Sequence, residues 1–272
     1  MGCILPDPDK IVVSADLSAG EPTCTSHFSK DKNYHAATFG MVGEEPYYEN
    51  GILYIDDIYL MVMSVSPIGR QRMLEVFNST FNGLTFQQQW KKDPEYIQKR
   101  VLKEERPLHK ILTLGLGYAM GPRKLVRSAF EKGYVLKEKV AKDFFRAYWD
   151  LFIDVKRLGD ALENKFKKQG YLINPFGYRL IPEPSYKCLN YFIQSSVSGI
   201  MHVLCAKFFA LCPFAEFLTV IHDEVLFEVP KDRLEDARRL FNQAVDSLND
   251  DLKWSVKIRC GFKPGKDWYE AH

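Results

Sequence analysis

The sequence predicts an α+β fold, with short strands near both ends of the chain and helices in its middle. Three observations predict it. The apolar, β-branched run at 11–16 is typical of a buried strand. Two more such runs, 217–221 and 225–229, flank the polar triplet HDE at 222–224, which is typical of a hairpin. From 58 to about 168 the apolar spacing is mostly helical.

The composition excludes several classes of protein. The 272 residues are 46% hydrophobic and 26% charged, which excludes fibrous, collagen-like and fully disordered chains and allows one large domain or two small ones. The six cysteines form no C-x-x-C pair, so a zinc ribbon or thioredoxin-type site has no support, and a reducing compartment such as the cytoplasm is expected. No signal peptide is expected, because the first ten residues hold three charges and no apolar core. Rossmann and Walker glycine motifs are absent.

Charge is unevenly distributed along the chain. Residues 1–60 hold 3 basic and 10 acidic side chains, residues 61–190 hold 24 and 13, and residues 191–272 hold 10 and 12. A basic middle between acidic ends can hold polyanions at one site and cations at another. The alternative is a solvated helical region that happens to be rich in lysine.

The first part of the chain is predicted element by element. The strand at 11–16 ends at Asp16, and Gly20-Glu21-Pro22 then allows a helix to begin, because proline is tolerated in a first turn. Residues 36–55 predict a loop or irregular hairpin. Turns near 82–83, 121–122 and 133 divide the helical region, and the glycines and prolines of 170–184 predict a further hairpin or loop.

The second part begins with a long amphipathic helix, from about 188 to 212. The apolar stretch 197–221 contains ionisable side chains, so we expect a buried helix and strand there and no membrane span. A helix from Pro230 to about 248 follows, and 255–260 is predicted as the last strand.

Two carboxylates stand out by position. Asp16 ends a strand and Asp223 lies in the hairpin turn, so both can meet at one edge of a small sheet, where oxygen ligands suit Mg²⁺. The alternative is that strand ends and turns simply favour aspartate.

A second set of residues lies in the basic middle. Arg106 and Lys110 share one face of a helix that Pro107 places near its start, and Tyr118 lies two turns further along. Two cations there can bind a triphosphate, although such a pair is also common on solvated helices. Gly115 and Gly117 provide either a flexible point or close packing.

Together these segments resemble a known family. VVSADLSAGE at 12–21, R-x-x-x-K-x-x-x-LG-x-x-Y at 106–118 and HDE at 222–224 resemble, in order, motifs A, B and C of family A DNA polymerases, the bacterial DNA polymerase I family. The flanking segments SHFS at 26–29 and WYEAH at 268–272 are also similar to that family.

The resemblance implies the right-hand polymerase fold. A palm of a small antiparallel sheet with packed helices would comprise 1–60 and 169–272, and a helical fingers subdomain would be inserted as 61–168. The implied activity is that of a DNA-directed DNA polymerase, a nucleotidyltransferase of DNA replication.

The resemblance also implies roles at the reacting centre. Asp16, Asp223 and the Leu17 carbonyl would bind two Mg²⁺ ions, with Glu224 as an auxiliary acid. Lys110 would bind the triphosphate and act as general acid for the leaving pyrophosphate.

Further residues would bind the nucleotide and DNA. The residues that face the incoming nucleotide would be Arg106, Lys110, Leu114, Tyr118 and Glu21, with Glu21 excluding a ribose 2′-hydroxyl. Those that contact primer–template DNA would be Asn190, Gln194, His222 and Arg179. The resemblance therefore implies deoxynucleoside triphosphates and primer–template DNA as partners. It implies no association with a membrane.

The sequence departs from the family pattern at several positions. Leu114 replaces the usual aromatic residue, Ala119 replaces a glycine, and Tyr59 replaces a histidine. These changes bear on nucleotide selection and leave the metal-binding aspartates intact.

The largest departure is that only about ten residues precede the motif A strand, where the family carries a thumb and an exonuclease-like domain. We therefore expect a split polymerase of the kind a phage could encode, acting in the host cytoplasm with a second polypeptide that supplies both. A fragment of a longer protein fits equally well. The alternative function is a catalytically inactive DNA-binding or replisome-interaction protein. An RNA polymerase of the same fold is disfavoured by Glu21.

Overall fold

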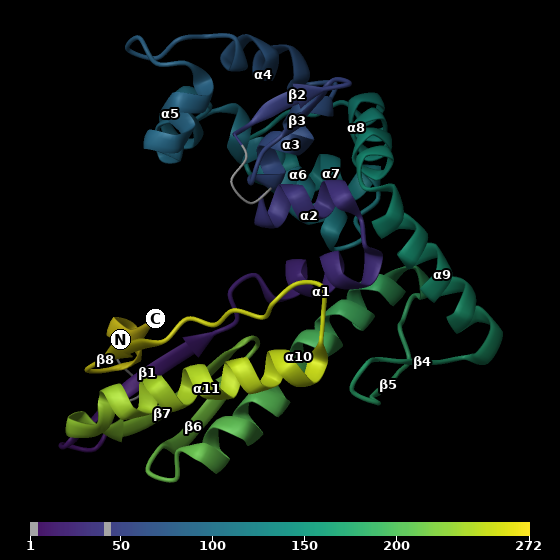
Figure 1. Cartoon of the computed structure of the whole chain (residues 1–272). Helices are drawn as coiled ribbons and strands as arrows, with labels where there is room; N and C mark the ends of the chain where they lie inside the picture. Colours follow the sequence, from purple (N-terminus) through teal and green to yellow (C-terminus); the bar gives the residue numbers. More distant parts are fainter. Residues whose placement is uncertain (1–4, 41–44) are drawn as a thin grey trace. The chain divides into compact units, whose positions relative to one another are not determined.

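The computed structural model describes residues 5–40 and 45–272, which form two compact units (Figure 1). The sheet unit comprises the described residues up to Phe28 together with Tyr171–Ile181 and Tyr191–His272. The helical unit comprises Ser29–Gly170 and Pro182–Asn190. The chain thus divides at other residues than the predicted 60 and 168, because 29–60 pack with the helices. One of the six cysteines, Cys3, lies outside the described residues.

One four-stranded antiparallel sheet organises the sheet unit. Its order is β6-β7-β1-β8, and the strands are β1 (Lys10–Asp16), β6 (Glu216–Ile221), β7 (Glu224–Pro230) and β8 (Lys263–Gly265). The predicted first strand and hairpin are confirmed. In the register of β1 with β7, Lys10 lies opposite Pro230 and Asp16 opposite Glu224.

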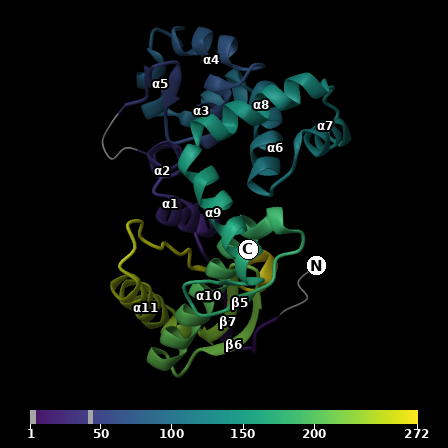
Figure 2. The same ribbon diagram turned by 90° about the vertical axis from the view of Figure 1, so that its right-hand side faces the viewer.

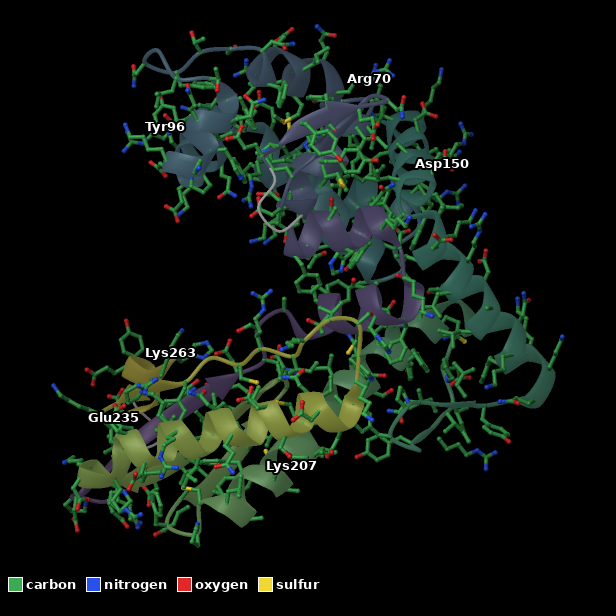
Figure 3. All side chains as sticks on the ribbon, viewed as in Figure 1. Arg70, Tyr96, Asp150, Lys207, Glu235 and Lys263 are labelled. Atoms are coloured by element: carbon green, nitrogen blue, oxygen red, sulfur yellow. The ribbon has the colours of Figure 1, made fainter. Side chains whose placement is uncertain are left out.

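Helices cover one face of this sheet, and the C-terminal segment covers the other. On the first face α10 (Cys188–Leu211) and α11 (Leu234–Leu252) pack through Phe208, Phe227 and Phe241 (Figure 2). Lys207 of α10, labelled in Figure 3, also donates a hydrogen bond to Ser247 of α11 at 2.9 Å. The other face buries Val12 and Leu226 against α12 (Trp268–Ala271).

Helix α10 is the most apolar long helix among the described residues. With the preceding 3₁₀ turn, Ser185–Leu211 is long and apolar enough to cross a membrane by length and composition alone. Its Phe208 nevertheless packs against the sheet residue Phe227, with ring centroids 4.8 Å apart. This is the packing of a core helix, as the sequence predicted. Strand β6, which follows, is an edge strand without a buried residue, so the expectation of a buried strand there is wrong.

The predicted strand at 255–260 is wrong. The Ile258 N–H and carbonyl bond to the Asn249 side chain of α11, at 2.7 and 3.0 Å, instead of to a neighbouring strand. Only an isolated bridge from Cys260 to Leu17 reaches the sheet, and the last strand is β8. The helix predicted from Pro230 begins with a 3₁₀ turn, Lys231–Arg233, before α11.

Short helices surround a separate apolar core in the helical unit, with Phe86, Phe144 and Phe152 fully buried. Its elements are α2 (Lys32–Phe39), β2 (Tyr47–Glu49), β3 (Ile52–Tyr54), α3 (Ile58–Val65), α4 (Arg70–Phe77), α5 (Phe86–Lys92), a π-helical turn (Tyr96–Val101), α6 (Glu105–Gly117), α7 (Pro122–Glu131), α8 (Glu138–Leu151) and α9 (Ile153–Gln169). In the sheet unit, helix α1 (Gly20–Ser29) follows β1, and a small hairpin pairs β4 (Leu172–Ile173) with β5 (Arg179–Leu180). The predicted helical middle and the hairpin within 170–184 are confirmed. The hairpin predicted within 36–55 is confirmed as β2–β3, but 36–39 belong to α2, and 41–44 lie outside the described residues.

The two glycines near the end of α6 differ in their surroundings. A Cβ at Gly115 would lie 2.6 Å from the Leu125 side chain, whereas a Cβ at Gly117 would meet nothing within 4 Å. Gly115 therefore permits close packing of α7 on α6. The helix ends at Gly117, and Ala119 then adopts a φ of 56°. This left-handed conformation favours glycine, the residue that Ala119 replaces in the family pattern.

We predict that Ala119→Gly stabilises the chain by about 0.5 kcal/mol, because relief of left-handed strain outweighs the entropy that glycine loses on folding. The matched control is Ala206→Gly in the exposed, right-handed interior of α10, which should cost about 1 kcal/mol. Urea unfolding of both variants measures the difference. Equal destabilisation by the two changes would contradict the prediction.

Candidate functional site

The predicted site residues fall into two groups, each within one unit. The sheet unit holds Asp16, Leu17, Glu21, Arg179, Gln194, His222, Asp223 and Glu224. The helical unit holds Arg106, Lys110, Leu114, Tyr118 and Asn190. Each group is described by itself.

Strand pairing brings Asp16 and Asp223 to the same end of the sheet. Asp16 is the last residue of β1, and Asp223 lies in the turn between β6 and β7. The Leu17 N–H donates to the Asp223 carbonyl at 2.9 Å, which fixes the two segments side by side. Both aspartates are half-buried. Among the described residues, neither carboxylate accepts a hydrogen bond or pairs with a cation.

Gly261 packs directly against Asp16. Its N–H donates to the Asp16 carbonyl at 2.8 Å, and an added Cβ would overlap Oδ1 of the Asp16 carboxylate. Beside it, burial raises the pKa of the Cys260 thiol to about 12, and the Asp16 carboxylate adds to this rise. The Cys260 side chain is therefore a neutral neighbour of Asp16 at physiological pH.

The sequence predicted Glu224 in the hairpin turn, and this is wrong. The turn has two residues, His222-Asp223, and Glu224 begins β7. Its buried carboxylate accepts hydrogen bonds from Ser14 Oγ at 2.6 Å and Trp268 Nε1 at 3.3 Å, while the other oxygen lies 3.2 Å from His272 Nδ1. Glu224 thus anchors the C-terminal segment. His222 is exposed, with a φ of 57°.

Glu21 and Gln194 meet each other. Gln194 Nε2 of α10 donates to Glu21 Oε1 in the first turn of α1, at 3.2 Å. Gly20 allows this approach, since its Cβ position is only 3.3 Å from the side chains of Leu17 and Val197. The Glu21 carboxylate is therefore oriented by a neutral amide donor.

Four of the five candidate residues of the helical unit lie on α6 or at its C-cap, and the fifth, Asn190, lies in α10. Lys110, Leu114 and Tyr118 are exposed at four-residue spacing. Arg106 differs, because its guanidinium pairs with the buried carboxylate of Asp57, with Nε at 3.0 Å and Nη2 at 2.8 Å from Oδ2. Sequence reasoning missed Asp57, although an aspartate directly before the helix predicted from 58 is a typical N-cap signal.

Asn190 lines a pocket of about 650 Å³ in the helical unit, between the α6–α7 connection, α8 and α9. Its Oδ1 atom is buried without a hydrogen-bond partner among the described residues. In the sheet unit, Arg179 is exposed and its guanidinium lies 4.4 Å from the centre of the Tyr171 ring.

A second acidic cluster lies at the other end of β1 and was missed from sequence. Asp7, Glu216 and Glu228 bring carboxylate oxygens within 4.8 Å of one another. The Lys10 ammonium contacts all three at 2.6 to 2.9 Å, and these contacts raise the pKa of Lys10. The ammonium already balances charge where a metal ion would otherwise be held.

Comparison with protein families decides the wider assignment. The sequence pattern of DNA polymerase family A matches residues 69–270. The chain belongs to DNA polymerase family A. This confirms the resemblance drawn from the motifs, although the matched region begins after Asp16 and Glu21.

Curated relatives of this family A chain are DNA polymerases. The thermostable DNA polymerase I of Thermus filiformis is 26% identical over 193 residues, which are 66% of this chain and 22% of that protein. DNA polymerase I of Streptococcus pneumoniae (strain TIGR4) is 24% identical over 50% of this chain and 17% of its own length. The DNA polymerase of Mycobacterium phage D29 is 32% identical over 47% of this chain and 21% of its own length. The chain thus spans about a fifth of these relatives.

A solved structure shares the fold. The polymerase domain of Pol1 from M. smegmatis, in complex with DNA primer-template and dNTP, matches 98% of this chain and 41% of its own with a TM-score of 0.67 at 19% identity. The predicted α+β polymerase architecture is confirmed.

Family A polymerases generally use divalent metal ions, and the aspartates of the sheet unit fit such ions. Asp16 and Asp223 offer half-buried carboxylate oxygens that no protein donor occupies in the described structure, at the point where β1 and the β6–β7 turn meet. Hard divalent cations prefer such oxygen ligands. Glu224, by contrast, has both oxygens in contact with protein groups.

We predict that Gly261→Ala weakens divalent-cation binding about tenfold or more, because the added methyl displaces the Asp16 carboxylate. Mn²⁺ binding followed by electron paramagnetic resonance measures the dissociation constant. Gly159→Ala is the control, since its Cβ would make ordinary contact with Leu189 at 3.6 Å. An unchanged Mn²⁺ affinity in Gly261→Ala would contradict the prediction.

The buried side of α6 is fixed by His109. Its Nδ1–H donates to the Glu105 carbonyl at 2.8 Å, so Nε2 accepts from Ser66 Oγ at 3.0 Å. Gly69 provides the space, because a Cβ there would lie 2.7 Å from Nε2. Burial lowers the pKa of His109 below its ordinary 6.5. The imidazole is therefore neutral in the fold.

We predict that the free energy of unfolding falls as pH is lowered through 6.5. The pKa of His109 is lower in the folded than in the unfolded chain, so the unfolded chain binds more protons and gains stability at acid pH. Urea unfolding between pH 5 and 8 measures this dependence. In His109→Gln the slope near pH 6 should become shallower, whereas the exposed control His35→Gln should keep it. Identical slopes in all three proteins would refute the role of His109.

Proposed function

We propose that this chain carries out template-directed DNA synthesis, adding deoxynucleotides to a primer 3′ end by two-metal-ion phosphoryl transfer. The observation that carries this proposal is that strand pairing holds Asp16 and Asp223 at the same end of the sheet, with carboxylates that have no partner among the described residues. Membership of family A supports it.

Asp16, Asp223 and the Leu17 carbonyl would hold two Mg²⁺ ions. When bound, the ions supply a lowered pKa for the primer hydroxyl and charge neutralisation for the leaving pyrophosphate. The protein contributes a fixed spacing of the two aspartates, because both are held by the backbone of the sheet. Glu224 would be an auxiliary acid near the metal ions, with its Oε1 held by Ser14 Oγ.

The α6 residues bind the incoming nucleotide in this proposal. Lys110 is exposed on the helix, so its ammonium can reach the triphosphate and donate a proton to the leaving pyrophosphate. Arg106 provides a fixed cation, Leu114 contacts the sugar, and Tyr118 packs beside the template base. Glu21, oriented by Gln194, crowds a ribose 2′-hydroxyl and so favours deoxynucleotides.

The DNA contacts are proposed for Asn190, Gln194, His222 and Arg179. Gln194, His222 and Arg179 are exposed. Amide side chains suit the minor groove, where hydrogen-bond acceptors are nearly independent of sequence, as a general copying enzyme requires. We propose further that a second polypeptide supplies a thumb and an exonuclease domain, and that both act in the cytoplasm, that of the host if a phage encodes them.

Primer extension with Mg²⁺ and deoxynucleotides tests the proposal. We predict that Asp16→Asn and Asp223→Asn each lower the rate about 1,000-fold or more, because the metal-bound transition state loses several kcal/mol of stabilisation. Asp246→Asn, on the exposed face of α11, is the matched control and should extend primers as the unchanged chain does. Activity that survives Asp223→Asn would refute the mechanism.

A chain that extends no primer alone is tested again with extract from its source. Extension restored by the extract, and lost again in Asp223→Asn, supports a polymerase that needs a partner. Primer–template binding without extension in either condition would favour the inactive DNA-binding protein instead.

A further inference from the structure

Asp57 links three elements of the helical unit through one buried carboxylate. Its Oδ1 caps α3, accepting from the N–H groups of Tyr59 at 2.9 Å and Leu60 at 3.1 Å. Its Oδ2 accepts from Gln98 Nε2 at 2.8 Å and from Arg106 of α6. The Asp57 side chain is only 3% exposed. Both oxygens are thus saturated by donors from fixed elements.

Arg106 is held on two sides by this arrangement. Its Nε and Nη2 atoms donate to Asp57 Oδ2, and its guanidinium carbon lies 5.0 Å from the centre of the Tyr59 ring. The Arg106 side chain is still 23% exposed. Nη1 has no acceptor among the described residues, so its N–H groups remain for a ligand outside the chain.

Separating Arg106 from Asp57 would cost a large free energy. Removing one partner of a buried ion pair leaves an uncompensated charge, which costs far more than a surface pair gains. Arg106 therefore stays with Asp57 when a ligand arrives and presents Nη1 from a fixed position. Lys110, one turn further along α6, is exposed and forms no ion pair with a carboxylate of the described residues. The two cations of α6 thus differ in freedom.

We propose that Asp57 is a positioning residue for nucleotide binding, which holds Arg106 so that its free Nη1 edge meets the triphosphate. This inference rests on the proposed function, since it takes a deoxynucleoside triphosphate as the ligand of α6. Asp57 acts only through Arg106 and touches no substrate. The benefit is preorganisation, because the entropy of ordering the long arginine side chain is lost on folding and not on binding.

Asp57→Asn isolates this role. Asparagine keeps an oxygen for the α3 cap, but its Nδ2 donor then faces the donors of Gln98 and Arg106, so Arg106 is released. The KM for deoxynucleoside triphosphates should rise about tenfold, the loss expected for one charge-assisted contact, while kcat changes less than about threefold.

Asp31→Asn is the matched control. Asp31 is also buried, at 3% whole-residue exposure against 6% for Asp57, and also caps a helix, α2, accepting from the Tyr34 N–H at 2.9 Å. Its other oxygen accepts from backbone N–H groups of α9, including Asp154 at 2.9 Å, and in the described part of the chain it bonds to no arginine. Asp31→Asn should lower the urea midpoint and leave KM unchanged. A similar rise in KM in both variants would mean that Asp57 is merely structural.

A mutant cycle with Arg106→Gln completes the test. Glutamine can still donate to Asp57, so the buried carboxylate keeps a partner. If Asp57 acts through Arg106, adding Asp57→Asn to Arg106→Gln produces no further rise in KM. A further tenfold rise, or a fall in KM in Asp57→Asn alone, would overturn the inference, and a fall would show that Asp57 competes with the nucleotide for Arg106.

Equilibrium dialysis with radiolabelled dATP separates failure of this inference from failure of the proposed function. If the unchanged chain binds dATP and Asp57→Asn binds it equally well, the positioning role is refuted and the proposed function stands. If the unchanged chain neither binds dATP nor extends a primer, with source extract or without it, the proposed function fails, and the inference fails with it.

Discussion

The antiparallel register of β1 against β7 is the constraint on which the candidate metal site depends. Pairing Asp16 with Glu224 places Asp223 one residue away, in the turn, where the Leu17 N–H holds its backbone. A slip of one residue would move every side chain of β1 to the opposite face, taking Val13 away from the phenylalanines of α10 and α11 and burying Ser14 among them. The apolar packing that fixes the register therefore also fixes the spacing of the two aspartates. Stability and the geometry of the site have the same origin.

Much of this architecture could be predicted from the sequence, because it is encoded locally. Runs of apolar, β-branched residues predicted β1, β6 and β7, and the helical period predicted α10 and the helical middle. The last strand was mispredicted because the apolar residues of 255–260 face the core without a strand partner, and the Asn249 side chain takes the backbone bonds of Ile258. Nothing near Ile258 in the sequence indicates a bond to a residue nine positions earlier.

The candidate site was predictable to a similar degree. Candidate residues that belong to short motifs, such as Asp16, Lys110 and Asp223, could be proposed from their positions within those motifs. Partners distant in sequence were not. Asp57 reaches Arg106 across 49 positions, and Glu224 reaches Ser14 across 210. Such pairings depend on tertiary packing. The sequence around a carboxylate therefore does not show whether the fold gives it hydrogen-bond donors. Asp57 and Glu224 accept several hydrogen bonds, whereas the Asp223 carboxylate accepts none among the described residues.

The carboxylates at the two ends of β1 differ in whether a cationic side chain of the protein neutralises them. At one end Lys10 supplies an internal counter-ion to Asp7, Glu216 and Glu228. At the other, about 20 Å away along the strand, Asp16 and Asp223 have none. This asymmetry bears on where divalent ions bind. An ion entering the Lys10 cluster would first have to displace a tethered ammonium, whereas an ion entering between β1 and the β6–β7 turn would displace none. The ions of the proposed mechanism are therefore expected at the Asp16 end of the sheet.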